Sequence, residues 1–105
     1  MVVGTPGGST IITSVYQTIL NVIEHGMTMQ QSVNALKFHH QWLPDQTNYE
    51  KNAFSEKTIE NLKSKGYVLT QMTGSLGRMD CILVRPDGKL EGGSDPRGDN
   101  TSVGW

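Results

Sequence analysis

The first apolar pattern in the chain predicts a long helix near the N-terminus. Apolar residues recur there at three- and four-residue spacing, the period of one helix face: Ile12, Val15, Tyr16, Ile19, Leu20 and Ile23. Ser9 or Thr10 can cap the start of this helix, and His25 followed by Gly26 marks its end. Because many of these residues are β-branched and have modest helix propensity, we expect burial to hold the helix.

Two shorter helices are predicted from their capping residues. Thr28 and Gln31 have the spacing of a capping box and predict a helix that begins at once. Ser55 is a suitable N-cap for a third helix, which Gly66 ends. The segment between these helices, residues 38–45, is too irregular for a secondary-structure prediction.

Beyond the third helix the pattern changes to that of strands. The predicted strands span residues 67–72, 79–84 and 89–91. Pro86-Asp87-Gly88 predicts the turn between the last two, because proline presets φ and glycine accepts a positive φ. The polar residues from Ser94 on are expected to form a surface tail. The chain is thus predicted to be α+β, with helices followed by an antiparallel β-meander.

Composition and charge narrow the classes of partner. The 105 residues suit one domain, residues 1–105. Nine basic and ten acidic residues are spread along the chain with no basic stripe, so no nucleic-acid partner is expected. No apolar run reaches the roughly 18 residues of a membrane span, so no membrane partner is expected either. The N-terminal residues lack the charged and apolar regions of a signal peptide, and the chain carries no compartment signal.

Few side chains suggest chemistry by themselves. Cys81 is the one cysteine and lies in an apolar run, which favours a small buried hydrophobe over a reactive thiol. His39 and His40 are adjacent, so their side chains diverge, and no further ligand stands at metal spacing. We expect neither a metal nor a cofactor. Spacing leaves a Ser-His-Asp triad open, because such residues meet only in space, but no local pattern supports one.

Two turn-like sequences have more to offer. Gly7-Gly8 stands just ahead of the long helix, where N–H groups lack intrahelical acceptors and face the positive end of the dipole. Such a pair can hold an anion or the oxyanion of acyl transfer, although Gly-Gly before a helix is more often just a tight turn. Asp95-Pro96-Arg97 predicts a turn in which the aspartate accepts local N–H groups. The overlapping Arg97-Gly98-Asp99 matches an adhesion tripeptide, which is too short to be specific.

Three stretches, taken in this order, resemble one family, the γ-glutamyltransferases or glutathione hydrolases. The first is Gly4 to Ser9 followed by Ile11-Ile12-Thr13, which looks like the family's glycine loop and its helix. The second and most specific runs from Ala35 to Asp45. The third runs from Gly88 to Leu90 and on to Gly92-Gly93-Ser94-Asp95-Pro96-Arg97. The resemblance extends nearly from end to end.

The resemblance implies an N-terminal-nucleophile hydrolase with an αββα sandwich. In that family a precursor cleaves itself, and the new N-terminal threonine of the small subunit attacks the γ-glutamyl amide of glutathione. The acyl group then passes to water or to an amino acid or peptide. By resemblance, the backbone N–H groups of Gly7 and Gly8 form the oxyanion hole. The implied partners are a γ-glutamyl substrate, the large subunit and the N-terminal half of the small subunit.

The sequence also departs from the family. Its nucleophilic threonine and the residues that grip the substrate's α-amino and α-carboxylate groups lie outside the matched stretch, so we expect the chain alone to be inactive. Leu36-Lys37 replaces the usual Pro-Arg, and Arg78-Met79-Asp80 differs before the strand. A fragment of this kind should expose apolar surface and can self-associate as a homodimer. The alternative is a stand-alone, non-catalytic module that binds a small carboxylate or forms an oligomer.

Overall fold

The structure is a computed structural model that describes residues 1–104, and its fold is α+β as predicted. The chain divides into two compact units, which are described separately. Unit 1 comprises Met1–Ala35 together with the residues from Gly77 on, and unit 2 comprises Leu36–Leu76.

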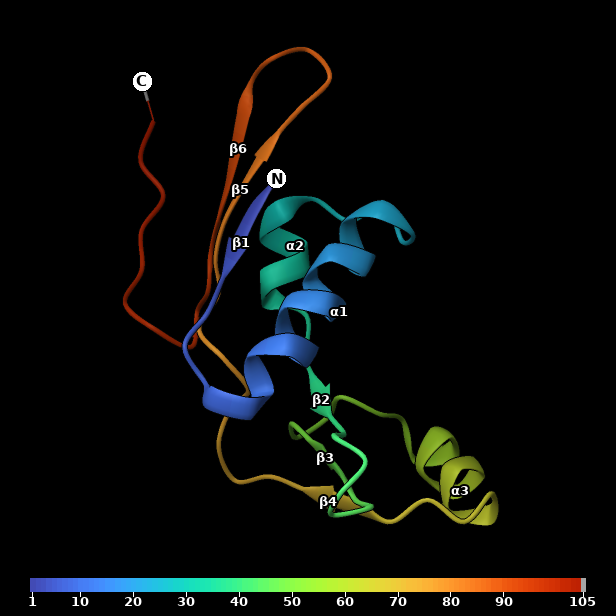
Figure 1. Ribbon diagram of the computed structural model, residues 1–105. Coiled ribbons are helices and arrows are strands. Elements are labelled where there is room, and N and C mark those ends of the chain that lie inside the picture. The colour runs from blue at the N-terminus through green and yellow to red at the C-terminus, as the bar shows by residue number, and fades with distance from the viewer. Residues whose placement is uncertain (105) are drawn as a thin grey trace. The chain divides into compact units, whose positions relative to one another are not determined.

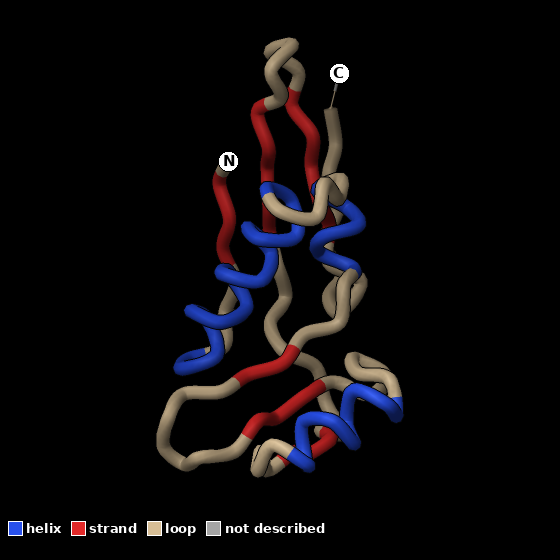
Figure 2. Tube along the Cα trace, turned by 90° about the vertical axis from the view of Figure 1, so that its right-hand side faces the viewer, coloured by secondary structure: helices blue, strands red, loops and turns tan. Residues whose placement is uncertain are grey.

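Unit 1 is a three-stranded antiparallel sheet with two helices on one face (Figures 1 and 2). Its elements are β1 (Val2–Gly4), η1 (Gly8–Thr10), α1 (Ile11–Ile23), α2 (Met29–Asn34), β5 (Asp80–Val84) and β6 (Leu90–Ser94). The strand order is β1-β5-β6, so the N-terminal strand pairs with one almost 80 residues later, Val3 opposite Cys81. β5 and β6 form the predicted hairpin, and its turn contains Gly88 at φ 80°.

The core of unit 1 lies between this sheet and its helices. Four buried residues form its centre: Met29, Val33, Met79 and Cys81. The interpretation of Cys81 as a small buried hydrophobe is confirmed. A Cβ on Gly93 would lie 3.0 Å from Met29 O and 3.1 Å from Val33 Cγ1, so glycine lets α2 lie close against β6.

The long helix forms as predicted, but the side that it buries is unexpected. Ser14 and Thr18 are the buried residues of α1, while Ile12 is 78% and Tyr16 61% exposed. The small side chains allow close helix packing: Thr18 Oγ1 donates to Ser14 O at 2.9 Å, and Ser32 Oγ of α2 donates to Thr18 O at 2.7 Å. The expectation that burial of the apolar residues holds this helix is therefore wrong for Ile12 and Tyr16.

Unit 2 contains a second three-stranded sheet and one helix. Its elements are β2 (Phe38–His39), β3 (Thr47–Tyr49), α3 (Glu56–Ser64) and β4 (Leu69–Gln71). The strand predicted at 67–72 forms as β4, but it pairs in parallel with β3 and not with β5. A parallel pair needs a crossover, and α3 lies within it. An aromatic cluster packs here, with ring centroids of Phe38 and Phe54 5.3 Å apart and those of Tyr49 and Phe54 5.2 Å apart.

The predicted caps of α2 and α3 are confirmed, whereas Thr10 stands at the N-cap of α1 without the predicted side-chain capping bond. Thr28 Oγ1 accepts the Gln31 N–H at 3.1 Å and Gln31 Oε1 accepts the Thr28 N–H at 2.9 Å, which completes the capping box. Ser55 Oγ accepts the Thr58 N–H at the start of α3. Gly66, at φ 91°, follows its end.

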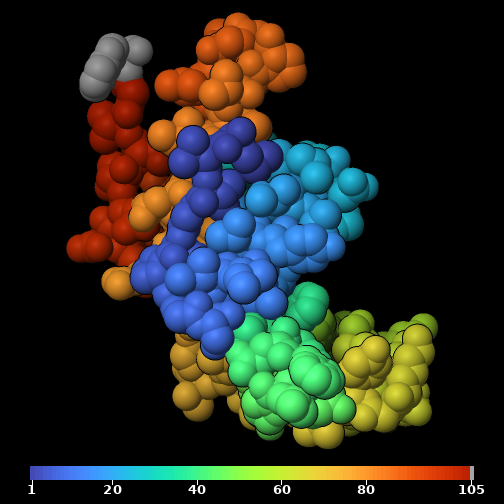
Figure 3. Space-filling view, in the orientation of Figure 1, coloured from blue at the N-terminus to red at the C-terminus, as the bar shows by residue number. Residues whose placement is uncertain are grey.

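The C-terminal segment is more than a surface tail. Asp95 is buried, in contrast to the surface position expected for it. Beyond it the chain runs back along the sheet on the side away from the helices, next to β6 (Figures 1 and 3). A Cβ on Gly92 would lie 2.7 Å from Ser102, and Ser94 Oγ bonds Ser102 Oγ at 2.6 Å. Within residues 1–104, no helix is long and apolar enough to cross a membrane.

Candidate active site

Gly7 and Gly8 lie in the loop that leads from β1 through η1 into α1. Gly7 has φ 144° and Gly8 φ 58°, a region that residues with a side chain rarely adopt. A Cβ on Gly7 would also lie 2.6 Å from Thr10 Oγ1, whereas a Cβ on Gly8 would meet no atom within 4 Å. Gly7 is therefore required by backbone conformation and by space, and Gly8 by backbone conformation alone.

The N–H groups of this pair are available to a ligand. Both residues are exposed, and within residues 1–104 neither the Gly7 N–H nor the Gly8 N–H donates a hydrogen bond. They stand ahead of α1, where N–H groups lack intrahelical acceptors and the helix dipole is positive. Two neighbouring donors of this kind can stabilise a carboxylate or the oxyanion of a tetrahedral intermediate.

The carbonyl groups of the same loop are hydrogen-bonded. Gly7 O accepts the Thr10 N–H at 3.2 Å and Thr10 Oγ1 at 2.9 Å. Pro6 O accepts Thr5 Oγ1 at 2.8 Å. Thr5 and Thr10 thus bond two carbonyl groups of the loop, while the N–H groups of the exposed residues Gly7 and Gly8 donate no hydrogen bond within residues 1–104.

Thr5 also fixes the loop to the segment that precedes β5. Its Oγ1 accepts the Arg78 N–H at 2.8 Å. Gly77, at φ 75°, passes so close that a Cβ there would lie 2.8 Å from Thr5 Oγ1 and 3.4 Å from Ser14 Oγ. The start of the glycine loop is therefore held by residues more than 70 positions away in the sequence.

The Asp95-Pro96-Arg97 turn forms as predicted. Asp95 Oδ1 accepts the Arg97 N–H at 2.9 Å. Its other oxygen, Oδ2, accepts the Met79 N–H at 2.8 Å, so the carboxylate also bonds the chain just before β5. This second bond crosses from one strand end to the other and is invisible in the local sequence.

The Arg97 side chain ties this turn to α2. Its Nη1 donates to Val33 O at 2.9 Å and to Asp95 Oδ1 at 3.0 Å, and its Nη2 donates to Ala35 O at 3.0 Å. A guanidinium suits these carbonyls, because the C-terminal end of a helix is the negative end of its dipole. The side chain is only 9% exposed, so Arg97-Gly98-Asp99 does not present an adhesion ligand.

The adjacent histidines are engaged locally in unit 2. His39 Nε2 bonds Gln41 Oε1 at 2.9 Å, and His40 Nε2 lies 3.1 Å from Asp45 Oδ1. Among residues 1–104 no three His, Cys, Asp or Glu side chains gather as metal ligands would.

Sequence reasoning singled out the glycines but missed the hydroxyls that hold them. Thr5 and Thr10 flank Pro6-Gly7-Gly8, two residues before Gly7 and two after Gly8. Hydroxyl side chains at such offsets commonly bond nearby backbone groups in turns. That pattern was the available signal.

Comparison with known proteins places the chain. A family model described as Gamma-glutamyltranspeptidase matches residues 1–105. The glutathione hydrolase proenzyme of Escherichia coli K12 is 43% identical over 106 residues, which cover 100% of this chain and 18% of that protein. That of Pseudomonas sp. strain A14 is 53% identical over 106 residues, which cover 92% of this chain and 18% of that protein.

Solved structures agree in fold. The γ-glutamyltranspeptidase of Pseudomonas nitroreducens complexed with L-DON superposes with a TM-score of 0.88 at 36% identity, covering 98% of this chain and 54% of that chain. The chain thus spans about a fifth of the length of the two curated relatives (18% in each case) and about half of this solved chain.

Proposed function

Because the chain belongs to the γ-glutamyltranspeptidase family, we propose that it supplies the oxyanion hole of a longer glutathione hydrolase. The longer enzyme would cleave the γ-glutamyl amide of glutathione and transfer the acyl group to water or to an amino acid or peptide. The observation that carries the proposal is the exposed pair of Gly7 and Gly8 N–H groups ahead of α1, which donate to no acceptor within residues 1–104.

The proposed chemistry uses these donors in one step. Attack of a threonine oxygen on the γ-glutamyl carbonyl carbon moves the π electrons of the C=O bond onto its oxygen. The Gly7 and Gly8 N–H groups would donate to that oxygen while it carries the charge. The charge is lost when the C=O bond re-forms and the C–N bond breaks, and the leaving amine takes up the proton that the threonine hydroxyl gave up on attack. Removing one such donor typically lowers kcat by about 10²- to 10³-fold, so the pair would be a large part of catalysis.

The 105-residue chain alone is proposed to be inactive. An oxyanion hole lowers a barrier only when an attacking group creates the charge. The family resemblance assigns that group to a threonine outside the matched segment. A hydrolase built this way needs both parts in one assembly.

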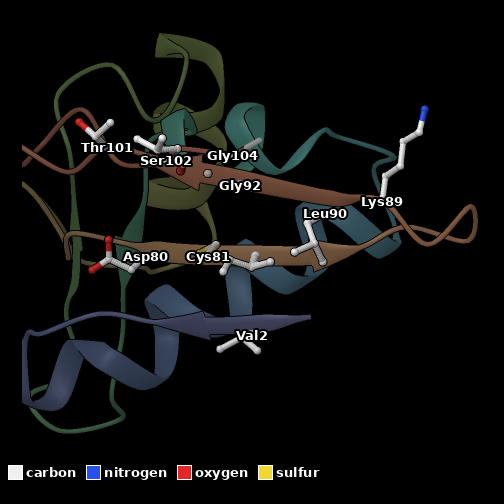
Figure 4. Close-up of a pocket in the computed structure, with 12 residues that line it drawn as sticks. Val2, Asp80, Cys81, Lys89, Leu90, Gly92, Thr101, Ser102 and Gly104 are labelled. Atoms are coloured by element: carbon white, nitrogen blue, oxygen red, sulfur yellow. The ribbon is translucent and has the colours of Figure 1, made fainter.

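The proposed partner is therefore the remainder of the enzyme, and unit 1 has apolar surface for it to cover. On the sheet face away from the helices, Val2 lies opposite Ile82 and Val84 opposite Leu90, and all four side chains are exposed. Figure 4 shows Val2 and Leu90 on this face, beside the open pocket that the C-terminal segment borders. In an αββα sandwich this face packs against a second sheet. Exposed patches of this kind mark interaction surfaces.

A chimera tests the proposal. The matching segment of the E. coli glutathione hydrolase proenzyme would be replaced by this chain, and turnover of a γ-glutamyl anilide measured. We expect turnover by the chimera and none by the chain alone.

Glycolic acid in place of Gly8 removes the N–H and keeps the backbone geometry, so kcat should fall about 100-fold with KM unchanged. Glycolic acid at Gly74, a bend in unit 2, is the matched control. An unchanged kcat with the Gly8 ester would refute the oxyanion role.

The same two donors support the second function, a non-catalytic carboxylate site. Exposed N–H groups at a helix start bind carboxylates without any nucleophile. Titration of the 105-residue chain with glutamate or glutathione distinguishes the binding function from the catalytic one. The Gly7 and Gly8 amide signals in NMR spectra would be monitored during the titration. Saturable shifts of both amides together with an inactive chimera would favour the binding module. Sedimentation of the free chain would show whether the exposed apolar faces bring two copies together.

A further inference from the structure

We propose that Thr5 and Thr10 are positioning residues that aim the two candidate donors, each through the carbonyl end of the donor's own peptide unit. The inference rests on the function proposed above and extends it to two side chains. Neither threonine would touch the substrate. Each would act through a glycine whose N–H does.

The geometry of a peptide unit links each donor to a carbonyl. The unit is planar, and in the trans form its C=O and N–H point in opposite directions. The Pro6–Gly7 and Gly7–Gly8 bonds are both trans. The direction of the Gly7 N–H is therefore fixed by whatever holds Pro6 O, and that of the Gly8 N–H by whatever holds Gly7 O.

Thr5 holds the first of these units. Its Oγ1 donates to Pro6 O at 2.8 Å, which directs the Gly7 N–H to the opposite side, away from the Thr5 hydroxyl. The same oxygen accepts the Arg78 N–H at 2.8 Å. The Thr5 hydroxyl is thus itself bonded to the segment that leads into β5. The direction of the Gly7 N–H is therefore fixed relative to the sheet as well as within the loop.

Thr10 holds the second unit. Both its N–H, at 3.2 Å, and its Oγ1, at 2.9 Å, reach Gly7 O. The Gly7 carbonyl therefore points into the first turn leading to α1, and the Gly8 N–H points out of it. Thr10 occupies the N-cap position of α1 but makes no side-chain capping bond, so its hydroxyl serves the glycine loop and not the helix end.

Glycine makes such fixing necessary. Without a Cβ it has more accessible backbone conformations than any other residue, and ordering it costs the most conformational entropy. Gly8 has no atom within 4 Å of its Cβ position, so neighbouring side chains cannot hold it by contact. The hydrogen bonds to the carbonyls are what remains to fix the direction of the N–H groups.

Residual dipolar couplings test the positioning directly, because they report the direction of an N–H bond. They would be measured on the weakly aligned 105-residue chain, with the amides of α1 as the reference frame. Thr5→Val should change the coupling of the Gly7 N–H, and Thr10→Val that of the Gly8 N–H. Thr5→Ser and Thr10→Ser keep the hydroxyls and should restore both. Unchanged couplings in both valine variants would overturn the inference.

The kcat of the chimera tests whether the direction of the two N–H groups matters for the reaction. Thr5→Val should lower kcat about tenfold and Thr10→Val about threefold, because the Thr10 N–H still holds Gly7 O; both effects should lie below the loss of a whole donor. KM should stay unchanged, since the oxyanion exists only after attack. Ser55→Ala removes a hydroxyl bond of similar length at α3, 3.1 Å, and should leave kcat unchanged, which controls for a general loss of stability.

The positioning role and the oxyanion hole fail separately. If the Gly8 ester lowers kcat and the threonine variants do not, positioning is refuted and the oxyanion hole stands. If the ester itself leaves kcat unchanged in an active chimera, the proposed function is refuted and the positioning role for catalysis falls with it. Lower kcat in the valine variants, with rescue by serine, supports both.

Discussion

Units 1 and 2 each contain a buried carboxylate that receives backbone N–H groups from distant segments, but the two are used differently. In unit 1, Asp95 bonds the Met79 N–H and also the guanidinium of Arg97, which in turn bonds Val33 O of α2. In unit 2, Glu50 accepts the Lys37 N–H at 2.7 Å and the Leu76 N–H at 2.9 Å, and so joins the two ends of the unit. A buried carboxylate thus joins the two ends of unit 2, whereas in unit 1 it connects α2 with the segment that precedes β5.

The glycine loop belongs to unit 1, so the bonds of unit 1 bear on the candidate site and those of unit 2 do not. The chain before β5 is held twice in succession, at Arg78 by Thr5 and at Met79 by Asp95. The first of these bonds also fixes the start of the glycine loop that carries the candidate donors. Unit 2 offers short strands, an aromatic cluster and a helix, α3, with no fully buried residue. Changes to unit 2 should cost stability without altering the glycine loop.

The largest effect is expected from Asp95→Ala. Losing this carboxylate leaves the buried Arg97 charge and the Met79 N–H without it, which should lower the free energy of unfolding by about 4 kcal/mol. Urea unfolding of the full chain measures the loss, and hydrogen exchange should show it first in α2, β5 and β6. Asp87→Ala, at the exposed hairpin turn, is the control and should change little. A loss of less than about 1 kcal/mol in the free energy of unfolding would show that the bonds of Asp95 to Arg97 and Met79 contribute no more than a surface ion pair does.

Glu50→Ala is the corresponding substitution in unit 2, because it removes that unit's buried carboxylate. Two N–H groups lose their buried acceptor, with an expected cost of about 3 kcal/mol. Hydrogen exchange at Lys37 and Leu76 should report it, and the amide shifts of Gly7 and Gly8 should not move. Glu56→Ala, in the exposed first turn of α3, serves as the comparison. Movement of the glycine signals would contradict the division between the units.

Gly77→Ala probes the contact between the pre-β5 segment and Thr5. A positive φ and a Cβ only 2.8 Å from Thr5 Oγ1 should together cost about 2 kcal/mol. Because Thr5 must move, this variant should also shift the Gly7 amide signal. Gly74→Ala has open space around its Cβ and no positive φ, so it should be nearly neutral. Equal stability of the two variants would show that the close approach is not needed.

The smallest effect is expected from Ser55→Ala. It removes the N-cap of α3 and should cost about 1 kcal/mol. Thermal unfolding would measure it against Ser64→Ala, whose hydroxyl bonds the Asn61 carbonyl three residues earlier. A Ser55→Ala loss no larger than that of the control would show that α3 does not depend on its cap.

Local signals predicted the helices and the hairpin well. The Thr28–Gln31 box, the Ser55 cap and the Pro86-Asp87-Gly88 turn each involve residues within three positions of one another, so a single sequence contains their physics. The glycine pair was singled out as a candidate in the same way, because its placement ahead of a helix is a local property.

Long-range pairing was not predictable in the same way. β1 is three residues long and is ordered by β5, almost 80 positions later, while β2 and β3 have two and three residues, too few for a period to show. The buried side of α1 was misjudged because its buried residues, Ser14 and Thr18, are small and polar, and a hydrophobic pattern does not detect them. Arg97 likewise acts on carbonyls more than 60 positions earlier.

Because a hydrogen bond to the carbonyl orients the peptide unit, a side-chain substitution can adjust the direction of a backbone N–H. A backbone N–H belongs to no side chain, so no codon change can adjust its direction directly, and changing Gly7 or Gly8 alters the backbone conformation itself. The hydroxyls on Pro6 O and Gly7 O, in contrast, belong to ordinary, mutable residues. Thr5 and Thr10 therefore give selection, or an engineer, a graded adjustment of the loop that leaves both glycines in place.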